Sequence, residues 1–487
     1  MKTMAKPEAV AIPKPNEGGD GPLYADRVKV HPRIFKGAFR QWKTRLLWVF
    51  LALYHCFAWV RWDRGEGVPD QAILFDLPGR RAYIFWIEIW PQEVYYLTGL
   101  LILAAVSLFA ASAIAGRVWC GFACFQTVWT DLFMMVEKFI EGDRNKRIRL
   151  DKAPLSLDKI TKRIAKHVIW ILISLFMGLS FLWYFNDAPT ITKEILSGEL
   201  GGWALITLGI LSSMTYLMAG FAREQVCFYM CPYGRFQGVM TDEDSLLVTY
   251  EDWRGEPRAK PGKNRDFSER GHCVDCSLCV QACPTGIDIR EGQQMECIGC
   301  GLCIDACNTM MEKFDLPKNL ISYDSYTNMI AREKGLGKQV HLIRPRTIYY
   351  AVILTAVLAV LLTSLGMRER LEVNIIRDRA PLFVTLSDGT IRNGYTYKIL
   401  NMESELKNYE LSIEGLDKVN MTMIGQEAKE QPKLDLTVGA DRIGAFKIFL
   451  KAPRAVLDGK STDIDFILKD KETGDILSQT TVFRGPN

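Results

Sequence analysis

The sequence lacks the features that mark several common classes of protein. Its net charge is only +4 over 487 residues, so no basic excess indicates a nucleic-acid partner. No GxGxxG loop follows a predicted strand and no CxxCH motif occurs, which argues against built-in NAD, flavin or haem c. No cysteine lies beyond Cys307, so the segment from residue 368 onward holds no disulfide.

Long apolar runs, in contrast, are plentiful. A helix needs roughly 20 apolar residues to cross a bilayer, and we expect about five transmembrane helices, at 46–62, 94–115, 167–185, 202–222 and 347–366. The first run follows about 45 polar residues, which is typical of a signal anchor and not of a cleaved signal peptide.

The distribution of lysine and arginine predicts the orientation in the membrane. Residues 1–44 carry nine of them and loop 116–166 carries eleven, whereas loop 63–93 carries three and loop 186–201 carries one. Because basic loops stay in the cytoplasm, we expect a bacterial inner-membrane protein that crosses the membrane several times. Its N-terminus would be cytoplasmic and its C-terminus periplasmic.

The expected domains follow from these runs. Between the outer ends of the first two spans, two β-prone runs flank Pro78-Gly79 and predict a hairpin, with Trp86 and Trp90 in an aromatic belt at the membrane surface. We interpret the hairpin as an interfacial plug, with a quinone-binding role as the alternative. The expected divisions are a cytoplasmic tail (1–44), a four-span membrane domain (45–222), a cytoplasmic domain (223–346) with a ferredoxin segment (270–312), a fifth transmembrane helix (347–366) and a periplasmic β domain (368–487).

The last of these segments alternates apolar and polar residues in short runs. Three examples are Tyr395-Tyr397-Ile399, Leu434-Leu436-Val438 and Ile464-Phe466-Leu468. With turn residues between them, the runs predict an Ig-like all-β sandwich of seven to nine strands, although the Cys–Trp–Cys hallmark is missing. The expected fold class is therefore an α-helical transmembrane bundle with a two-cluster, ferredoxin-like α+β insert and a C-terminal sandwich.

Twelve of the thirteen cysteines fall on the predicted cytoplasmic side, where thiols stay reduced and serve as metal ligands or redox centres. The stretch CVDCSLCVQACPTGIDIREGQQMECIGCGLCIDAC (273–307) contains Cys-x2-Cys-x2-Cys-x3-Cys twice. In such double runs the fourth cysteine of each run ligates the cluster of the other run. The sequence thus predicts two [4Fe–4S] clusters, one held by Cys273, Cys276, Cys279 and Cys307 and the other by Cys297, Cys300, Cys303 and Cys283.

Four further cysteines form two Cys-x3-Cys pairs, in GRVWCGFACFQTVW (116–129) and AREQVCFYMCPYGRF (222–236). Their similar positions after pairs of spans suggest an internal repeat. On a helix, residues four apart share one face with Cβ atoms about 5–6 Å apart, farther than a disulfide prefers. Such a pair of thiolates could share a soft metal ion such as Cu(I). We therefore expect Cys120, Cys124, Cys227 and Cys231 to be catalytic and copper-binding, with packing as the alternative.

Pro232 distinguishes the second pair. It disfavours helical backbone at Cys231, so Cys231 is expected at a helix boundary with Pro232 opening the next helix. A thiol at a helix N-terminus has a lowered pKa, and Arg223 and Arg235 would lower it further. Phe125, not proline, follows Cys124, so the same argument is weaker for the first pair.

Other candidates are weaker. Met214 and Met218 share a helix face and could be thioether ligands for copper, but membrane packing explains them better. His55 and Cys56 lie in the first apolar run, where an interhelical hydrogen bond is as reasonable as a ligand role. His272 precedes the first cluster cysteine and could tune that cluster, although a simple loop position is the better explanation.

The motifs WCGFACFQTVWTDLF and CFYMCPYGRFQ, the double ferredoxin run and the β-rich C-terminal segment together resemble the cytochrome c oxidase accessory proteins CcoG/FixG/RdxA, from about residue 35 onward. The usual first motif of that family has proline where this chain has Phe125. The resemblance implies an inner-membrane protein that serves assembly of a cbb3-type oxidase by reducing Cu(II) to Cu(I). Its expected partners are oxidase assembly factors and a copper chaperone.

The leading hypothesis is a membrane-bound cupric reductase, an oxidoreductase in which electrons pass through two [4Fe–4S] clusters to copper near Cys227 and Cys231, with Cys120 and Cys124 assisting. One alternative is a quinol-linked polyferredoxin that carries electrons. Another is a non-catalytic assembly scaffold or redox sensor that docks through the outer β domain. The sequence points to lipid and to no nucleic acid, allows a homodimer, and leaves the electron donor unassigned.

Overall fold

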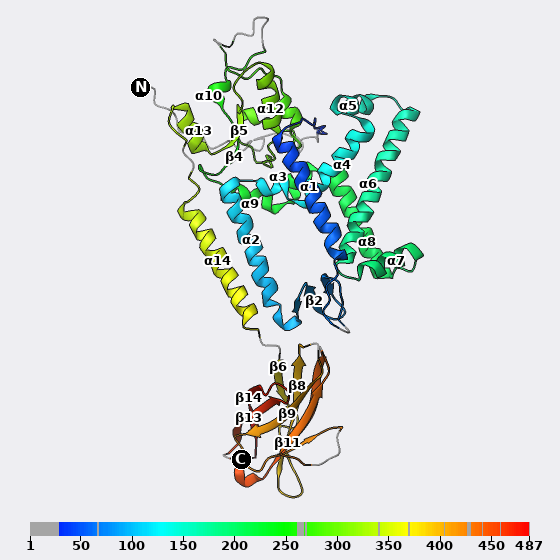
Figure 1. The fold of residues 1–487 in the computed structure, drawn as a ribbon, viewed down its shortest axis with the longest axis vertical. Helices are drawn as coiled ribbons and strands as arrows, with labels where there is room; N and C mark the ends of the chain where they lie inside the picture. The colour runs from blue at the N-terminus through cyan, green and yellow to red at the C-terminus, as the bar shows by residue number, and fades with distance from the viewer. Residues whose placement is uncertain are drawn as a thin grey trace, which may run out of the picture. The chain divides into compact units, whose positions relative to one another are not determined.

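The computed structural model describes residues 29–486 except 66–67, 261–266, 268–269, 339–340, 369–370, 404, 426–429, 441 and 458. The chain forms two compact units (Figure 1). The first unit comprises residues 1–59, 74–78 and 100–354, and the second comprises residues 60–73, 79–99 and 355–487. Most of the expected tail, residues 1–28, lies outside the described residues.

Four helical segments are long and apolar enough to cross a membrane in the described part of the chain. They are Pro91–Ala115, which includes α2 (Tyr95–Ala115), then α6 (Leu157–Trp183), then Gly202–Ala222, made of α8 (Gly202–Thr215) and the π-helical η3 (Tyr216–Ala222), and finally α14 (Pro345–Gly366). These match four of the five expected spans.

The run expected at 46–62 takes a different form. Helix α1 (Ala38–Cys56) begins in the charged sequence before the run and ends within it, and the single 3-10 turn η1 (Phe57–Trp59) follows. Only part of the apolar run is therefore helical, and α1 is not among the four long apolar helices. A fifth crossing stays a prediction.

Helix α4 (Phe125–Glu141) organises the first unit beside α1 and α6. Leu47 and Leu51 of α1 pack with Val128 of α4 and Met177 of α6 in one apolar cluster. Helix α6 begins at Ser156, whose hydroxyl accepts a hydrogen bond from the backbone N–H of Lys159. Two shorter helices, α5 (Arg144–Lys152) and α7 (Ala188–Ser197), complete this region.

The cysteine-rich segment folds around a small core of its own. Strands β4 (Leu247–Tyr250) and β5 (Ile321–Asp324) pair antiparallel, and Val248 and Ile321 pack with Ile304 and Met311 of α12 (Leu302–Lys313). This α+β arrangement is the one expected for the ferredoxin segment. The remaining short elements are α10 (Asp252–Gly255), α11 (Leu278–Ala282), η5 (Ile289–Glu291) and α13 (Tyr326–Glu333).

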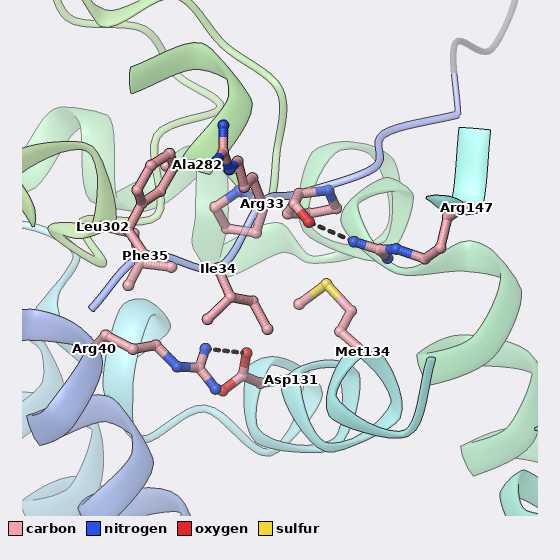
Figure 2. A pocket seen from close by; sticks show the side chains of 11 residues that line it. Arg33, Ile34, Phe35, Arg40, Asp131, Met134, Arg147, Ala282 and Leu302 are labelled. Carbon is pink, nitrogen blue, oxygen red and sulfur yellow. Dashed lines mark hydrogen bonds and ion pairs between the residues drawn. The ribbon is translucent and has the colours of Figure 1, made fainter. Parts of the chain in front are cut away.

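Contacts at the N-terminal end of α1 connect this helix to the cysteine-rich core. Helix α1 has only Gly37 at its N-cap position, and the carboxylate of Asp305 in α12 accepts the backbone N–H groups of Phe39 and Arg40 at 3.3 and 2.8 Å. The Arg40 guanidinium donates to Asp131 of α4 at 2.8 Å. Figure 2 shows residues 32–35 in a small pocket that Asp131 and Met134 of α4 line together with Ala282 and Leu302. Asp305 therefore connects the cysteine-rich core to α1, and Arg40 connects α1 to α4, within this unit.

Strands β1 (Ile73–Asp76) and β2 (Arg81–Ile84) flank the Pro78-Gly79 turn as expected. Strand β2 pairs with β3 (Ile87–Ile89). The side chain of Trp86 is exposed, as an aromatic belt requires. The belt prediction is wrong for Trp90, which is buried with the Arg81 guanidinium 3.8 Å from its ring centroid.

The C-terminal part of the second unit is a β sandwich. One sheet has the order β10-β12-β8-β6 with β7 also on β8, and the other has the order β11-β9-β13-β14. Tyr397 of β8 stacks on Phe466 of β13 with ring centroids 5.3 Å apart, which closes the core between the sheets. The strands are β6 (Leu371–Arg377), β7 (Val384–Thr385), β8 (Ile391–Asn401), β9 (Lys407–Glu414), β10 (Asn420–Met423), β11 (Lys433–Val438), β12 (Arg442–Ala452), β13 (Ser461–Asp470) and β14 (Ile476–Arg484).

All nine residues of the three alternating triplets are buried in this core. The predicted sandwich is therefore confirmed, with nine strands in the part of the chain that the structure describes.

Candidate redox site

The first set of ferredoxin cysteines surrounds one cavity. Its lining includes Cys273, Cys276 and Cys279 from the segment around α11, and Cys307 from α12. Asp275 and Ser277 have positive φ angles of 48° and 55°, so the backbone between the cysteines turns sharply. Tyr250 and apolar side chains form much of the remaining wall of the cavity.

The second set surrounds a neighbouring cavity. Cys283, Cys297, Cys300 and Cys303 line it together with Cys279 of the first set. Gly299 adopts a φ of 64°, and a side chain there would come within 2.7 Å of the Tyr323 hydroxyl oxygen. The Gly299 backbone N–H donates to the Cys297 sulfur at 3.5 Å, so this loop brings a backbone amide close to a cysteine sulfur.

These cavities fit iron–sulfur clusters. Each is lined by the four thiols that the spacing assigns to one cluster, and a donor set made entirely of sulfur suits a soft metal. Burial raises the pKa of the Cys279, Cys300 and Cys307 thiols to about 12, so metal binding would have to displace their protons.

The two Cys-x3-Cys pairs adopt the same local arrangement. Cys120 lies in α3 (Val118–Phe122) and Cys124 is the N-cap residue of α4. Cys227 lies in the π-helical η4 (Val226–Met230) and Cys231 is the N-cap residue of α9 (Pro232–Met240).

This arrangement corrects one expectation and extends another. Neither pair lies on one continuous helix, because each second cysteine has extended backbone, with φ and ψ of −61° and 128° at Cys124 and −85° and 110° at Cys231. Cys231 stands at the helix boundary that Pro232 predicts. Cys124 stands at an equivalent boundary although Phe125 follows it, so proline is not needed for this geometry.

The two Cys-x3-Cys pairs also lie near each other. Burial raises the pKa of the Cys120 thiol to about 12, and nearby Cys124 and Cys227 raise it as well. Burial raises the pKa of the Cys227 thiol to about 11, with further increases from Cys124 and Cys231. Arg117 lowers the pKa of both thiols. These interactions place the four cysteines near one another, and we define Cys120, Cys124, Cys227 and Cys231 as the thiol site.

Helix α3, which carries Cys120, lies directly against the loop that carries Cys300. A Cβ atom on Gly121 would come within 2.9 Å of the backbone of Ile298, Gly299 and Cys300. Lys43 of α1 donates to the Gly121 carbonyl oxygen at 3.0 Å. Helix α3 therefore touches the loop that carries Cys300, without side chains in between.

Three residues that the sequence analysis did not select hold this contact together. Arg117 donates to the carbonyl oxygens of Gly234 in α9 and Met295 in the cysteine-rich segment. The Cys120 thiol donates to the Gln237 side-chain oxygen at 3.5 Å, and the Tyr323 hydroxyl donates to the Gly299 carbonyl oxygen at 2.6 Å. No local sequence signal marks Gln237 or Tyr323, whereas Arg117 was visible only as a basic residue at the membrane edge.

The structure shows a carboxylate partner for Arg223. Its guanidinium is buried and binds Glu137 of α4 at 2.7 Å, while Arg147 binds the same carboxylate at 3.0 Å. Burial would raise the pKa of Glu137, but Arg223, Lys166 and Arg147 lower it to about 2. Arg223 therefore anchors the turn before the second thiol pair to α4.

The weaker candidates have the following surroundings. His55 Nδ1 lies 2.6 Å from the Ser180 hydroxyl oxygen, which is the interhelical hydrogen bond considered as its alternative role. Cys56 and Met214 are exposed on helices expected in the membrane. The His272 ring contacts Phe267 at a centroid distance of 6.3 Å.

Family models match three parts of the chain. Residues 222–326 match a 4Fe-4S dicluster domain, and residues 97–146 match a 4Fe-4S binding domain. Residues 361–486 match the IG-like fold at the C-terminal of FixG.

Curated relatives cover nearly the whole chain. The nitrogen fixation protein FixG of Rhizobium meliloti is 45% identical over 462 residues, covering 89% of this chain and 88% of FixG. Protein RdxA of Cereibacter sphaeroides is 43% identical over 472 residues, covering 95% and 99%. Among solved structures, a FixG-related protein from Vibrio parahaemolyticus has 23% identity and a TM-score of 0.21, and covers 25% of this chain and 100% of its own. The chain is a membrane-associated iron–sulfur electron-transfer protein, and it belongs to the FixG/RdxA family.

Proposed function

We propose that this protein reduces Cu(II) to Cu(I) at the thiol site, for the assembly of a cbb3-type cytochrome c oxidase. The observation that carries the proposal is the contact of α3 with the Cys300 loop, where the Gly121 position leaves no room for a side chain. It puts a set of soft ligands beside the iron–sulfur segment. The two [4Fe–4S] clusters, when bound by their eight cysteines, would supply single electrons.

The thiol site suits copper as a substrate. Reduction of Cu(II) to Cu(I) takes one electron and no proton, and thiolate ligands favour the Cu(I) product. Because burial raises the pKa of Cys120 and Cys227 to about 12 and about 11, these thiols are protonated when no metal is present, and copper binding would release their protons. Gln237 accepts from the Cys120 thiol, and Arg117 stabilises negative charge on both cysteines.

Production of a Cu(I)-chelator complex by the chemically reduced protein tests this proposal. The Cys227→Ser/Cys231→Ser double variant should lose most of the activity while it keeps the iron content of the unaltered protein. Cys56→Ser is the matched control, because Cys56 is exposed on α1 and outside the thiol site, and it should retain full activity. An unchanged rate in the double variant would remove the thiol site from the reaction.

The proposal also includes a place in the cell. We propose an inner-membrane protein with a cytoplasmic iron–sulfur segment and a periplasmic β sandwich, which would leave the sandwich free to meet oxidase assembly factors and a copper chaperone. The basic loops of the sequence support this orientation. Reporter fusions after residue 250 and after residue 480 test it, since only the second should be active as a periplasmic alkaline phosphatase.

A further inference from the structure

A second polar region lies beside the membrane helices and is not part of the thiol site. It is a cavity of about 300 Å³ between α4, α6, η3 and the N-terminal segment. We define it as the basic cavity, and its charged lining residues are Lys29, Glu137, Arg163, Lys166, Arg223 and Glu224.

Positive charge exceeds negative charge in the wall of the basic cavity. Four of the six charged lining residues are cations and two are carboxylates. Asp151 and Glu141 add two carboxylates beside it, through ion pairs of 2.9 Å to Lys29 and to Lys166. Arg147 adds one cation through Glu137, which makes five cations and four carboxylates among the described residues. Burial and Lys29 lower the pKa of nearby His31 to about 4, so that ring adds no charge at neutral pH.

Two cations of the basic cavity lie near the predicted cytoplasmic end of a membrane helix, where a lipid headgroup would lie. Lys166 and Arg163 are in the first turns of α6, at the end of the helix that the positive-inside pattern places in the cytoplasm. The side chain of Lys166 is only 4% exposed, so its ammonium group is held at the cavity wall and does not extend into solvent.

Apolar side chains are also exposed on two of the elements that line the basic cavity, α6 and η3. On α6, an exposed apolar stripe with helical spacing runs in the direction of the membrane. Phe221, which lines the cavity, and Leu217 expose apolar side chains on η3. The stripe on α6 consists of Ile164, Val168, Ile171 and Leu175.

We propose that the basic cavity binds the phosphodiester headgroup of an anionic phospholipid, with the acyl chains along the apolar surface of α6 and η3. Basic pockets between transmembrane helices on the cytoplasmic side are typical sites for such headgroups. A headgroup with one negative charge matches the single excess cation of the cluster. The occupied site would join α4, α6 and η3 through Arg223, four residues before Cys227.

Native mass spectrometry of the purified full chain tests this site with two lipids of the same acyl composition. Phosphatidylglycerol should remain bound under conditions that remove phosphatidylcholine, and its binding should weaken as salt increases. Equal retention of the two lipids would overturn the proposal. This comparison uses the unaltered protein, so its result does not depend on whether a variant folds.

The Lys29→Gln/Arg163→Gln double variant tests the residues. These two side chains are the more exposed cations of the cavity, so their replacement leaves Glu137 with its buried partners Arg223 and Lys166. Loss of two cations should weaken phosphatidylglycerol binding about 30-fold. Lys162→Gln, which removes an exposed cation of α6 outside the cavity, is the matched control and should bind normally. Normal binding by the double variant would overturn the assignment.

Competition identifies the source of the phosphate. Inorganic phosphate at millimolar concentration should not displace phosphatidylglycerol, because it lacks the acyl chains that occupy the apolar surface. Full displacement by inorganic phosphate, or by a short-chain quinone, would show that another ligand class occupies the cavity and would overturn the proposal.

Discussion

The contact of Gly121 with the Cys300 loop gives the sharpest single-residue prediction. In the Gly121→Ala variant, the new Cβ would lie 2.9 Å from three backbone atoms, which are the Cα of Cys300 and the carbonyl oxygens of Ile298 and Gly299. Carbon atoms are in favourable contact at about 3.5 Å, so α3 and the loop must separate by roughly 0.6 Å. Backbone atoms cannot rotate away as a flexible side chain can.

The expected cost follows from this overlap. Overpacking of a tight contact destabilises a protein by about 1–3 kcal/mol. Because a displacement of about 1 Å can slow a reaction by roughly 100-fold, we expect Cu(II) reduction to slow by roughly 10-fold while the iron content stays normal. Thermal unfolding in detergent measures the first effect, and the Cu(I)-chelator assay measures the second.

Gly209→Ala is the matched control. Gly209 lies in α8, and a Cβ there would have no other atom within 4 Å. The reduction rate of this variant should equal that of the unaltered protein, and its melting temperature should not fall, because alanine is favoured over glycine inside a helix. If Gly121→Ala gave the same two values as Gly209→Ala, the α3–loop contact would not be the tight junction that the structure describes.

Three further predictions concern the same unit. Glu137→Gln should destabilise it by about 3–5 kcal/mol, because buried cations lose their partner, as measured by chemical denaturation. The pKa of Glu137 is lowered to about 2 in the folded state from an ordinary 4.5. Its carboxylate therefore adds roughly 3 kcal/mol to the free energy of unfolding above pH 4.5, and this contribution is lost as the pH falls toward 2. The variant should lack this pH-dependent loss, and an identical acid profile would contradict the ion-pair account. Cys303→Ser should lower the iron content by about four atoms per chain, whereas Cys56→Ser should not, and equal iron in both would exclude Cys303 as a ligand. Tyr323→Phe removes the hydrogen bond to Gly299 and should cost about 1 kcal/mol, with no change in iron content, and an unchanged unfolding midpoint would contradict it.

The sequence predicts the local parts of this molecule well. The alternation in Tyr395, Tyr397 and Ile399 places all three in the sandwich core, because side chains of a strand alternate between two faces. The spacing of the double cysteine run separates the eight thiols into the two sets that line the two cavities. Apolar length also locates four long helices. In each case the signal lies within one short segment.

The sequence fails where distant segments meet. The ion pair of Arg223 with Glu137 joins residues 86 positions apart, so Arg223 could only be read as a basic residue near Cys231. The proximity of the two thiol pairs depends on the packing of α3 against α9, which follows Cys231. Neither cysteine motif predicts that packing. Trp90 was expected at the membrane surface because its burial under Arg81 cannot be seen in the local pattern.

The central claim is that electrons leave this protein through the thiol site. The most direct measurement mixes the fully reduced protein, freed of excess reductant, with two equivalents of Cu(II) per chain, one for each cluster, and follows the copper and reduced-cluster EPR signals by freeze-quench. We predict that the two signals disappear together, with one Cu(II) lost for each electron. In the Cys227→Ser/Cys231→Ser variant both signals should persist. Loss of both signals at the unaltered rate in that variant would contradict the claim.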